Sequence, residues 1–135
     1  MLDLDPALLA EFEALGAVSA TSRCQLAEQS DIICSAVVND RQTLDVIQGG
    51  DGVLAGATAG ALIILHSTIS VATCEEVSWA ADAKGVSVID AAVSGAAERS
   101  ELGTPSLMIG GDPPSVERAM PPDRTGWLRG DLPHG

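Results

Sequence analysis

Short apolar runs of strand length alternate with helical patterns along this chain, and this order constrains the fold more than any other feature of the sequence. The runs occupy residues 32–38, 61–65 and 86–89. They are nearly continuous, which is typical of parallel strands buried on both faces. The segments between them are long enough to form helices that cover a sheet. The sequence therefore predicts an α/β fold, a parallel sheet flanked by helices.

Helix boundaries in this sequence are marked by capping residues. Asp5 and Pro6 are typical of an N-cap and a first helical residue, and Gly16 suits the left-handed turn that ends a helix. A helix is expected from about residue 6 to residue 15, with one apolar stripe formed by Leu8, Leu9, Phe12 and Leu15. Three further helices are expected to start at Asn39-Asp40, at Ser70 and at Asp112-Pro113.

The amount and sign of charge narrow the possible partners. The chain has 135 residues, 46% of them hydrophobic, which is enough for a single hydrophobic core. It carries 19 Asp or Glu residues against 7 Lys or Arg residues, giving a formal net charge of −12. Because nucleic-acid binding depends on clustered basic side chains, a nucleic-acid partner is not expected.

Cysteine content and hydropathy indicate a cytoplasmic protein. Cys24, Cys34 and Cys74 are odd in number and widely spaced, which suits reduced thiols better than a disulfide framework. No Cys-x-x-Cys pair is present, so a metal site is not expected. The first residues lack the basic region of a signal peptide, and the longest apolar run, residues 60–65, is too short to span a bilayer. We therefore expect no membrane partner.

Residues 88–95 carry the most functional information, because the run Val-Ile-Asp-Ala-Ala-Val leads directly into Ser94 and Gly95. This pattern predicts a buried strand that delivers a Ser-Gly turn into a cleft. Leu102-Gly103-Thr104 follows, and the run 107–111 then ends in Gly-Gly. Together these segments resemble the substrate-binding signature of the 3-hydroxyisobutyrate dehydrogenase and 6-phosphogluconate dehydrogenase family, the β-hydroxyacid dehydrogenases. Departures from the family's usual proline and two glycines are Ala92, Ala96 and Arg99.

The resemblance covers about residues 1–120 and implies an incomplete Rossmann-type sheet that lacks its first βα unit. Met1–Pro6 is similar to the end of the family's second strand, whereas the Gly-x-Gly-x-x-Gly loop that normally lies about 20 residues earlier is absent. The family's interdomain helix with its catalytic lysine has no match either. We therefore interpret residues 1–120 as a partial NAD(P)-binding domain, truncated at both ends, and residues 121–135 as a disordered tail.

The resemblance implies cofactor-binding residues at the carboxyl ends of the strands, namely Asp3, Val38, Asn39, Ser67 and Thr68. Asp3 would bind the adenine ribose hydroxyls and repel a 2′-phosphate, which favours NAD over NADP. The alternatives are a solvated Asp3 and an Asn39 that only caps a helix. Ser67 and Thr68 resemble the family's Ser-Thr turn at the nicotinamide end of the cofactor.

Substrate binding is implied at Ser94 and Gly95, because a small hydroxyl and exposed backbone amides can hold a carboxylate without blocking hydride transfer. The alternative is a simple strand-ending turn. Arg99, in the loop that follows, is either a further anion contact or a solvated side chain.

The implied activity is hydride transfer between a small 3-hydroxy acid and NAD or NADP. No catalytic residue is identified, because Lys84 is the only lysine and its place in a last helical turn is explained by interaction with the helix carboxyl end. Whether the chain alone is an enzyme therefore stays open. The alternative is a non-catalytic remnant or interaction module whose exposed sheet edges pair with another chain or with a second copy.

Overall fold

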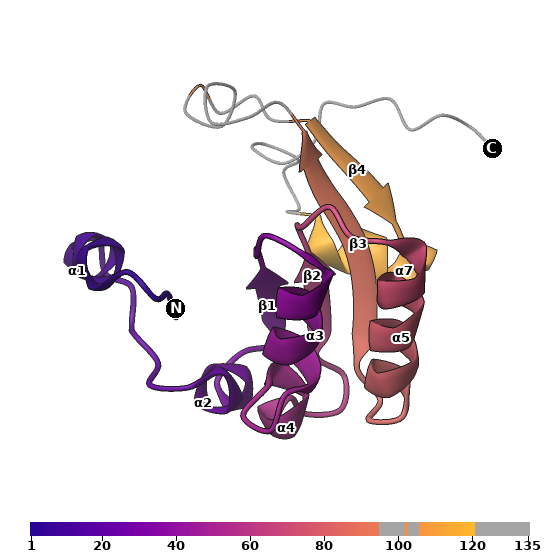
Figure 1. Cartoon of the computed structure of the whole chain (residues 1–135), viewed down its shortest axis with the longest axis horizontal. Coiled ribbons are helices and arrows are strands. Elements are labelled where there is room, and N and C mark those ends of the chain that lie inside the picture. The colour runs from indigo at the N-terminus through magenta and orange to yellow at the C-terminus, as the bar shows by residue number, and fades with distance from the viewer. Residues whose placement is uncertain (95–101, 103–105, 121–135) are drawn as a thin grey trace.

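The predicted α/β fold is confirmed by the computed structural model, which describes residues 1–94, 102 and 106–120. Four strands form one sheet in the order β1-β2-β3-β4 (Figure 1). The first three strands are parallel, and β4 pairs antiparallel with β3. In chain order the elements are α1 Pro6–Ala14, α2 Arg23–Glu28, β1 Ile32–Ser35, α3 Asp40–Gln48, α4 Val53–Gly56, β2 Leu62–Leu65, α5 Val71–Asp82, β3 Ser87–Ser94, β4 Ser106–Gly110 and α7 Pro113–Ala119.

The helices predicted from capping residues begin where the sequence places them. The N-cap side chain accepts a hydrogen bond from a first-turn N–H in each of four helices, so the donors there are satisfied. These N-caps are Asp5 for α1, Asn39 for α3, Ser70 for α5 and Asp112 for α7.

One face of the sheet forms the larger hydrophobic core. Ile33 of β1 and Ile63 and Leu65 of β2 point to this face and are buried. Helices α3, α4 and α5 cover it with Ile47, Val53, Leu54, Val77 and Ala81. Successive strand residues alternate between faces, so the neighbouring residues Leu62 and Ile64 belong to a second cluster on the opposite face.

The opposite face is covered only in part by the described residues. Helix α7 packs on β2 and β3, and Arg118 of α7 donates hydrogen bonds to the carbonyl oxygens of Gly60 and Asp31. On the same face of β1, Ile32 is 43% exposed and Cys34 is exposed. The strand predicted over residues 32–38 is shorter in the structure and ends at Ser35. It is buried on one face only, because α7 packs on β2 and β3 and leaves Ile32 and Cys34 exposed.

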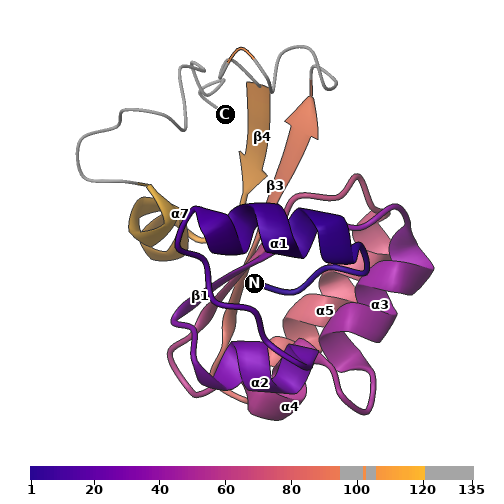
Figure 2. The same cartoon turned by 90° about the vertical axis from the view of Figure 1, so that its left-hand side faces the viewer.

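The amino-terminal segment differs from the sequence prediction. Residues 1–5 form no strand, although Met1 bonds with residues 18–20 through its backbone, as in the 2.8 Å bond from the Ala20 N–H to the Met1 carbonyl oxygen. A strand needs a paired neighbour to satisfy its backbone groups, and none of the described strands pairs with this segment. Helix α1 has no buried residue, and its apolar stripe faces solvent, with Leu15 80% exposed. Figures 1 and 2 show α1 outside the helices that pack on the sheet.

Two short helices, α2 and α4, were not predicted, because four to six residues are too few to show a helical period. They pack closely on each other. A Cβ atom at Gly56 would collide with the backbone of Cys24, so glycine permits this approach.

The contact made by Lys84 also differs from the prediction, because its Nζ donates a hydrogen bond to the Leu54 carbonyl oxygen in α4.

Several predictions concern residues that the structure does not describe. These are Gly95, the loop that contains Arg99, the Gly103-Thr104 segment and the tail 121–135. Ser94, the last residue of β3, marks the described end of the predicted Ser-Gly turn.

Candidate functional site

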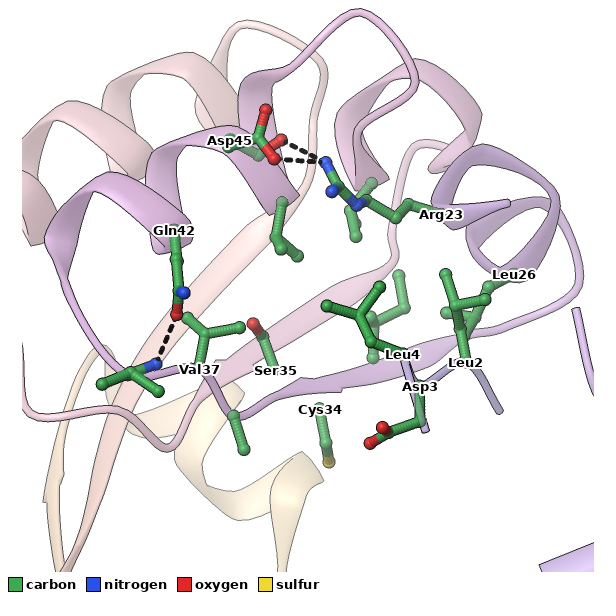
Figure 3. A pocket seen from close by; sticks show the side chains of 15 residues that line it. Leu2, Asp3, Leu4, Arg23, Leu26, Cys34, Ser35, Val37, Gln42 and Asp45 are labelled. Atoms are coloured by element: carbon green, nitrogen blue, oxygen red, sulfur yellow. Dashed lines mark hydrogen bonds and ion pairs between the residues drawn. The ribbon is translucent and has the colours of Figure 1, made fainter. Parts of the chain in front are cut away.

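A cavity of about 540 Å³ lies beside β1, and we call it the β1 pocket. Figure 3 shows residues 2–4 on one side of it and residues 34–37 on the other. Helices α2, α3 and α4 complete the wall. The lining residues are Leu2, Asp3, Leu4, Arg23, Leu26, Ile33, Cys34, Ser35, Ala36, Val37, Val38, Gln42, Asp45, Val46 and Val53.

The pocket brings together two of the predicted cofactor-binding residues, Asp3 and Val38. It adjoins the carboxyl end of β1, and carboxyl ends of parallel strands are where open α/β sheets bind ligands. The Val38 N–H donates to Gln42 Oε1 at 2.9 Å, and Asn39 Oδ1 accepts from the Gln42 N–H at 3.0 Å. Asn39 therefore caps α3, and its predicted place beside the cofactor stays a prediction.

Ser67, two residues after β2, contacts the pocket wall from behind the lining residues. Its side chain is 6% exposed, and its Oγ accepts a 2.8 Å hydrogen bond from the N–H of Val37, a residue that lines the pocket. Thr68 is exposed at the same end of β2. The Nδ1 atom of His66, the residue before Ser67, lies 3.0 Å from the Ala91 carbonyl oxygen.

The pocket is mainly apolar, and its one basic side chain among the described lining residues is already paired. Arg23 forms an ion pair with Asp45 at 2.8 Å and also donates to the Asp45 carbonyl oxygen at 3.0 Å. The Asp45 carboxylate therefore offsets the positive charge that Arg23 brings to the pocket. Asp3 contributes a carboxylate at the pocket.

Ser35 is a polar residue in the apolar wall. It is 6% exposed, and within the described part of the chain its Oγ has no hydrogen-bond partner. Buried polar groups usually have one, so the Ser35 hydroxyl is an exception to this rule within the described chain. The signal was present in the sequence as the hydroxyl that follows Ile-Ile-Cys, but the prediction treated residues 32–38 as uniformly apolar.

Asp40 connects the two helices that begin at this edge of the sheet. Its carboxylate accepts from the Ser70 N–H at 3.2 Å and from Thr73 Oγ1 at 3.1 Å. These hydrogen bonds lower the pKa of the Asp40 carboxyl. Sequence reasoning missed this link, because the residues lie about 30 positions apart and no local pattern joins them.

The substrate-binding residue predicted in the described region, Ser94, lies away from the β1 pocket. Ser35, Leu65 and Asp90 are aligned across the sheet, and β3 continues past Asp90 to an exposed Ser94. At about 3.3 Å per residue, Ser94 lies about 13 Å farther along the strand direction than Asp90. In Figures 1 and 2 the ends of β3 and β4 project beyond the rest of the sheet.

None of the helices in the described residues is long and apolar enough to cross a membrane. No group of three or more His, Cys, Asp or Glu side chains in these same residues is arranged to hold a metal ion.

A parallel sheet with helices on its faces and a pocket at the carboxyl end of a strand defines the Rossmann-type class of α/β folds. Within that class, the family described as the NAD binding domain of 6-phosphogluconate dehydrogenase matches residues 1–122. The chain therefore belongs to this family, as the sequence motif indicated.

Relatives with known names support the same assignment. The chain is 33% identical over 121 residues to the 3-hydroxyisobutyrate dehydrogenase of Pseudomonas aeruginosa, covering 90% of this chain and 41% of the relative. It is 31% identical over 108 residues to the NAD-dependent L-serine dehydrogenase of the same species, covering 80% and 36%. The crystal structure of 3-hydroxyisobutyrate dehydrogenase from Salmonella typhimurium superposes with a TM-score of 0.78 at 32% identity, covering 86% of this chain and 40% of that one. The chain thus spans about two fifths of the length of these relatives.

Proposed function

We propose that this chain is the NAD(P)-binding part of a β-hydroxyacid dehydrogenase, with the β1 pocket holding the adenosine end of the cofactor. The observation that carries the proposal is the meeting of Asp3 with residues 36–38 at the carboxyl end of β1. An apolar cavity of this volume is within the usual range for small-molecule sites. The Asp3 carboxylate would accept hydrogen bonds from the ribose hydroxyls, and its charge would disfavour a 2′-phosphate, so NAD is preferred to NADP.

The positions of the other predicted residues fit an elongated dinucleotide. Ser67 fixes the backbone at Val37, and Thr68 is exposed at the end of the adjacent strand. Ser94 lies farther along the strand direction, where the nicotinamide end and the substrate carboxylate would meet. When bound, the cofactor would accept a hydride from the hydroxyl-bearing carbon of a small 3-hydroxy acid.

The described residues fit the adenosine half of the cofactor better than its pyrophosphate. The amino end of α3 is occupied by its own Asn39 cap and by Asp40, and Arg23 is paired with Asp45. A pyrophosphate normally takes the open N-terminus of a helix after a glycine-rich turn. We therefore expect the 135-residue chain to bind NAD weakly.

Backbone NMR titration of the chain with NAD, NADP and AMP tests this proposal. Changes in backbone chemical shift should concentrate at Asp3, residues 36–39 and residues 67–68. NAD should give larger changes than NADP. Asp3→Asn should reduce them, whereas Asp31→Asn removes the same charge at the amino end of β1 and serves as the matched control. Shifts clustered elsewhere, or none at millimolar NAD, would refute the adenosine site. Sub-micromolar affinity would contradict the weak binding expected from the capped amino end of α3 and the paired Arg23.

The role of Ser94 needs a separate experiment, because the substrate site is proposed from resemblance. A chimera that adds the flanking segments of a close relative should have dehydrogenase activity. Ser94→Ala should then raise KM by about tenfold with a smaller change in kcat, as expected for a ground-state contact. Ser87→Ala, at the other end of β3, is the control. Unchanged kinetics for Ser94→Ala would remove this residue from the site.

A further inference from the structure

We propose that His66 is a positioning residue for Ser94 and acts on it through the backbone of β3. The inference rests on the proposed substrate-binding role of Ser94 and adds the residue that holds it in place. His66 directly follows β2, and Ser94 is the last residue of β3. The two strands are parallel neighbours, so both residues lie toward the edge of the sheet where open α/β folds bind ligands.

Strand β3 extends beyond the end of β2. The ladder between the two strands ends at the pair Leu65 and Asp90, whereas β3 continues to Ser94. On its other side β3 stays paired with β4 up to Ser94 and Ser106, and Figure 1 shows these two strands projecting together. On the side of β2, the backbone groups of β3 beyond Asp90 need partners from outside the ladder.

His66 provides such partners with both its side chain and its backbone. Its Nδ1 lies 3.0 Å from the Ala91 carbonyl oxygen, and its own carbonyl oxygen accepts a 3.4 Å hydrogen bond from the Val93 N–H. Alternate residues of a strand direct their backbone groups to the same side, so Ala91 and Val93 both turn toward the end of β2. The contacts of His66 therefore reach the residue immediately before Ser94.

The side-chain contact requires a particular state of the imidazole ring. A carbonyl oxygen only accepts hydrogen bonds, so Nδ1 of His66 must carry the proton and donate it to the Ala91 oxygen. Ala91 is 1% exposed. A buried carbonyl that loses its partner is costly, so the imidazole stabilises this part of β3.

The last residues of β3 are only thinly covered by side chains. Val93 is 40% exposed and Ser94 is exposed, so backbone hydrogen bonds contribute more to the position of this end than burial does. The contacts at Ala91 and Val93 set the direction in which β3 leaves the sheet, and hence the place of the Ser94 hydroxyl. Binding of a substrate carboxylate depends on that place, because small displacements of a binding group weaken its effect strongly.

The first test measures the state of His66 in the full 135-residue chain. Nitrogen chemical shifts of the neutral imidazole at alkaline pH distinguish a proton on Nδ1 from a proton on Nε2. We expect the Nδ1 form to predominate in His66, and an acetylated histidine amide in the same buffer serves as the reference. This measurement needs neither a variant nor enzymatic activity.

Two variants separate the hydrogen bond from the bulk of the ring. In His66→Asn the side-chain Nδ2 takes the place of the histidine Nδ1 and can donate, whereas His66→Leu puts a methyl group there. Amide hydrogen exchange at Val93 should be about tenfold faster in His66→Leu and within about twofold of the wild type in His66→Asn. Exchange at Ile64, inside the ladder, should not change, which separates a local effect from a loss of global stability.

A double-mutant cycle in the chimera with the flanking segments tests whether His66 acts through Ser94. His66→Leu should raise KM for the hydroxy acid by about fivefold and leave KM for NAD unchanged, and His66→Asn should restore the wild-type value. Because the two residues act on one contact, the double variant should be no worse than Ser94→Ala alone. A residue that only stabilised the fold would give effects that multiply.

The proposal fails if the neutral imidazole carries its proton on Nε2, or if His66→Leu leaves exchange at Val93 unchanged. It also fails if the effects of His66→Leu and Ser94→Ala on KM multiply, although the substrate-binding role of Ser94 would then stand. An unchanged KM for Ser94→Ala would remove the substrate site itself and the role of His66 with it. Thermal melting establishes that the variants are folded, and if His66→Leu is not, the tautomer measurement decides on the unchanged chain.

Discussion

The hydroxyl oxygen of Ser67 accepts a 2.8 Å hydrogen bond from the backbone N–H of Val37, a residue 30 positions earlier in the chain. This contact joins the carboxyl ends of β2 and β1 just where the β1 pocket begins. The Val37 N–H lies beyond the last residue of β1, Ser35, and the Ser67 hydroxyl is its acceptor. Ser67 therefore holds the pocket wall in place and does not act only as a hydroxyl presented to a ligand.

Ser67→Ala should destabilise the fold, because the Val37 N–H would lose its partner in a part-buried position. Leaving such a donor unsatisfied costs about 1–2 kcal/mol. Thr68→Ala is the matched control, since Thr68 is exposed, and it should change stability by less than about 0.5 kcal/mol. Urea unfolding of both variants checks the difference. Equal midpoints would show that water replaces the Ser67 hydroxyl without cost.

Asp40→Asn should lower the melting temperature by a few degrees at neutral pH. Hydrogen bonds from Ser70 and Thr73 lower the pKa of Asp40, so the ionised form stabilises the folded state. Because the folded-state pKa is depressed, this stabilisation is present above the ordinary Asp pKa of about 3.9 and is lost as the pH falls. Melting curves from pH 7 to pH 3 should converge for the two proteins. Asp51→Asn, in an exposed turn, should show no such convergence.

The local parts of the fold could be predicted from the sequence, because the determining residues are neighbours in the chain. Asp5, Asn39 and Ser70 mark helix starts through bonds to N–H groups two or three positions away. The apolar run 61–65 likewise predicts β2, which is buried at every position. Short-range hydrogen bonding marks these helix starts, and the continuous apolar composition of residues 61–65 marks a strand buried on both faces.

The burial of β1 and α1 and the polar contacts of the pocket depend on distant segments, and the sequence predictions there were less successful. The run 32–38 has the composition of a strand buried on both faces, but only one face is covered by the described helices. The links from Ser67 to Val37 and from Asp40 to Ser70 each span about 30 residues. No periodicity encodes such contacts, so they appear only when the sheet aligns the strands.

All three cysteines should react slowly with iodoacetamide at pH 7. Desolvation is the largest cause that raises the pKa of each thiol, and Glu28 adds to the effect at Cys24. A raised pKa leaves little thiolate, which is the reactive form. Mass spectrometry of alkylated peptides should show rates that still increase above pH 9, with glutathione as the reference thiol. A Cys34 rate above that of glutathione at pH 7 would contradict this expectation.

Asp90→Asn should stabilise the protein at neutral pH, opposite in sign to Asp40→Asn. Asp90 lies on β3 between Leu65 and Gly110, and its Oδ1 is buried without a partner in the described chain. Desolvation raises the pKa of its carboxyl, so ionisation opposes folding. Because the folded-state pKa is raised, the wild type is relatively more stable below the ordinary pKa and loses that advantage as the pH rises through the folded-state value.

The gain from Asp90→Asn should be modest at pH 7, because the amide is still a half-buried polar group and only the cost of desolvating the charge is removed. It should shrink toward pH 4 as the wild-type carboxyl becomes protonated. Chemical unfolding at a series of pH values measures this difference, with Asp82→Asn on exposed α5 surface as the control for net charge. A gain that does not change with pH would mean that Asp90 acts through packing and not through its charge.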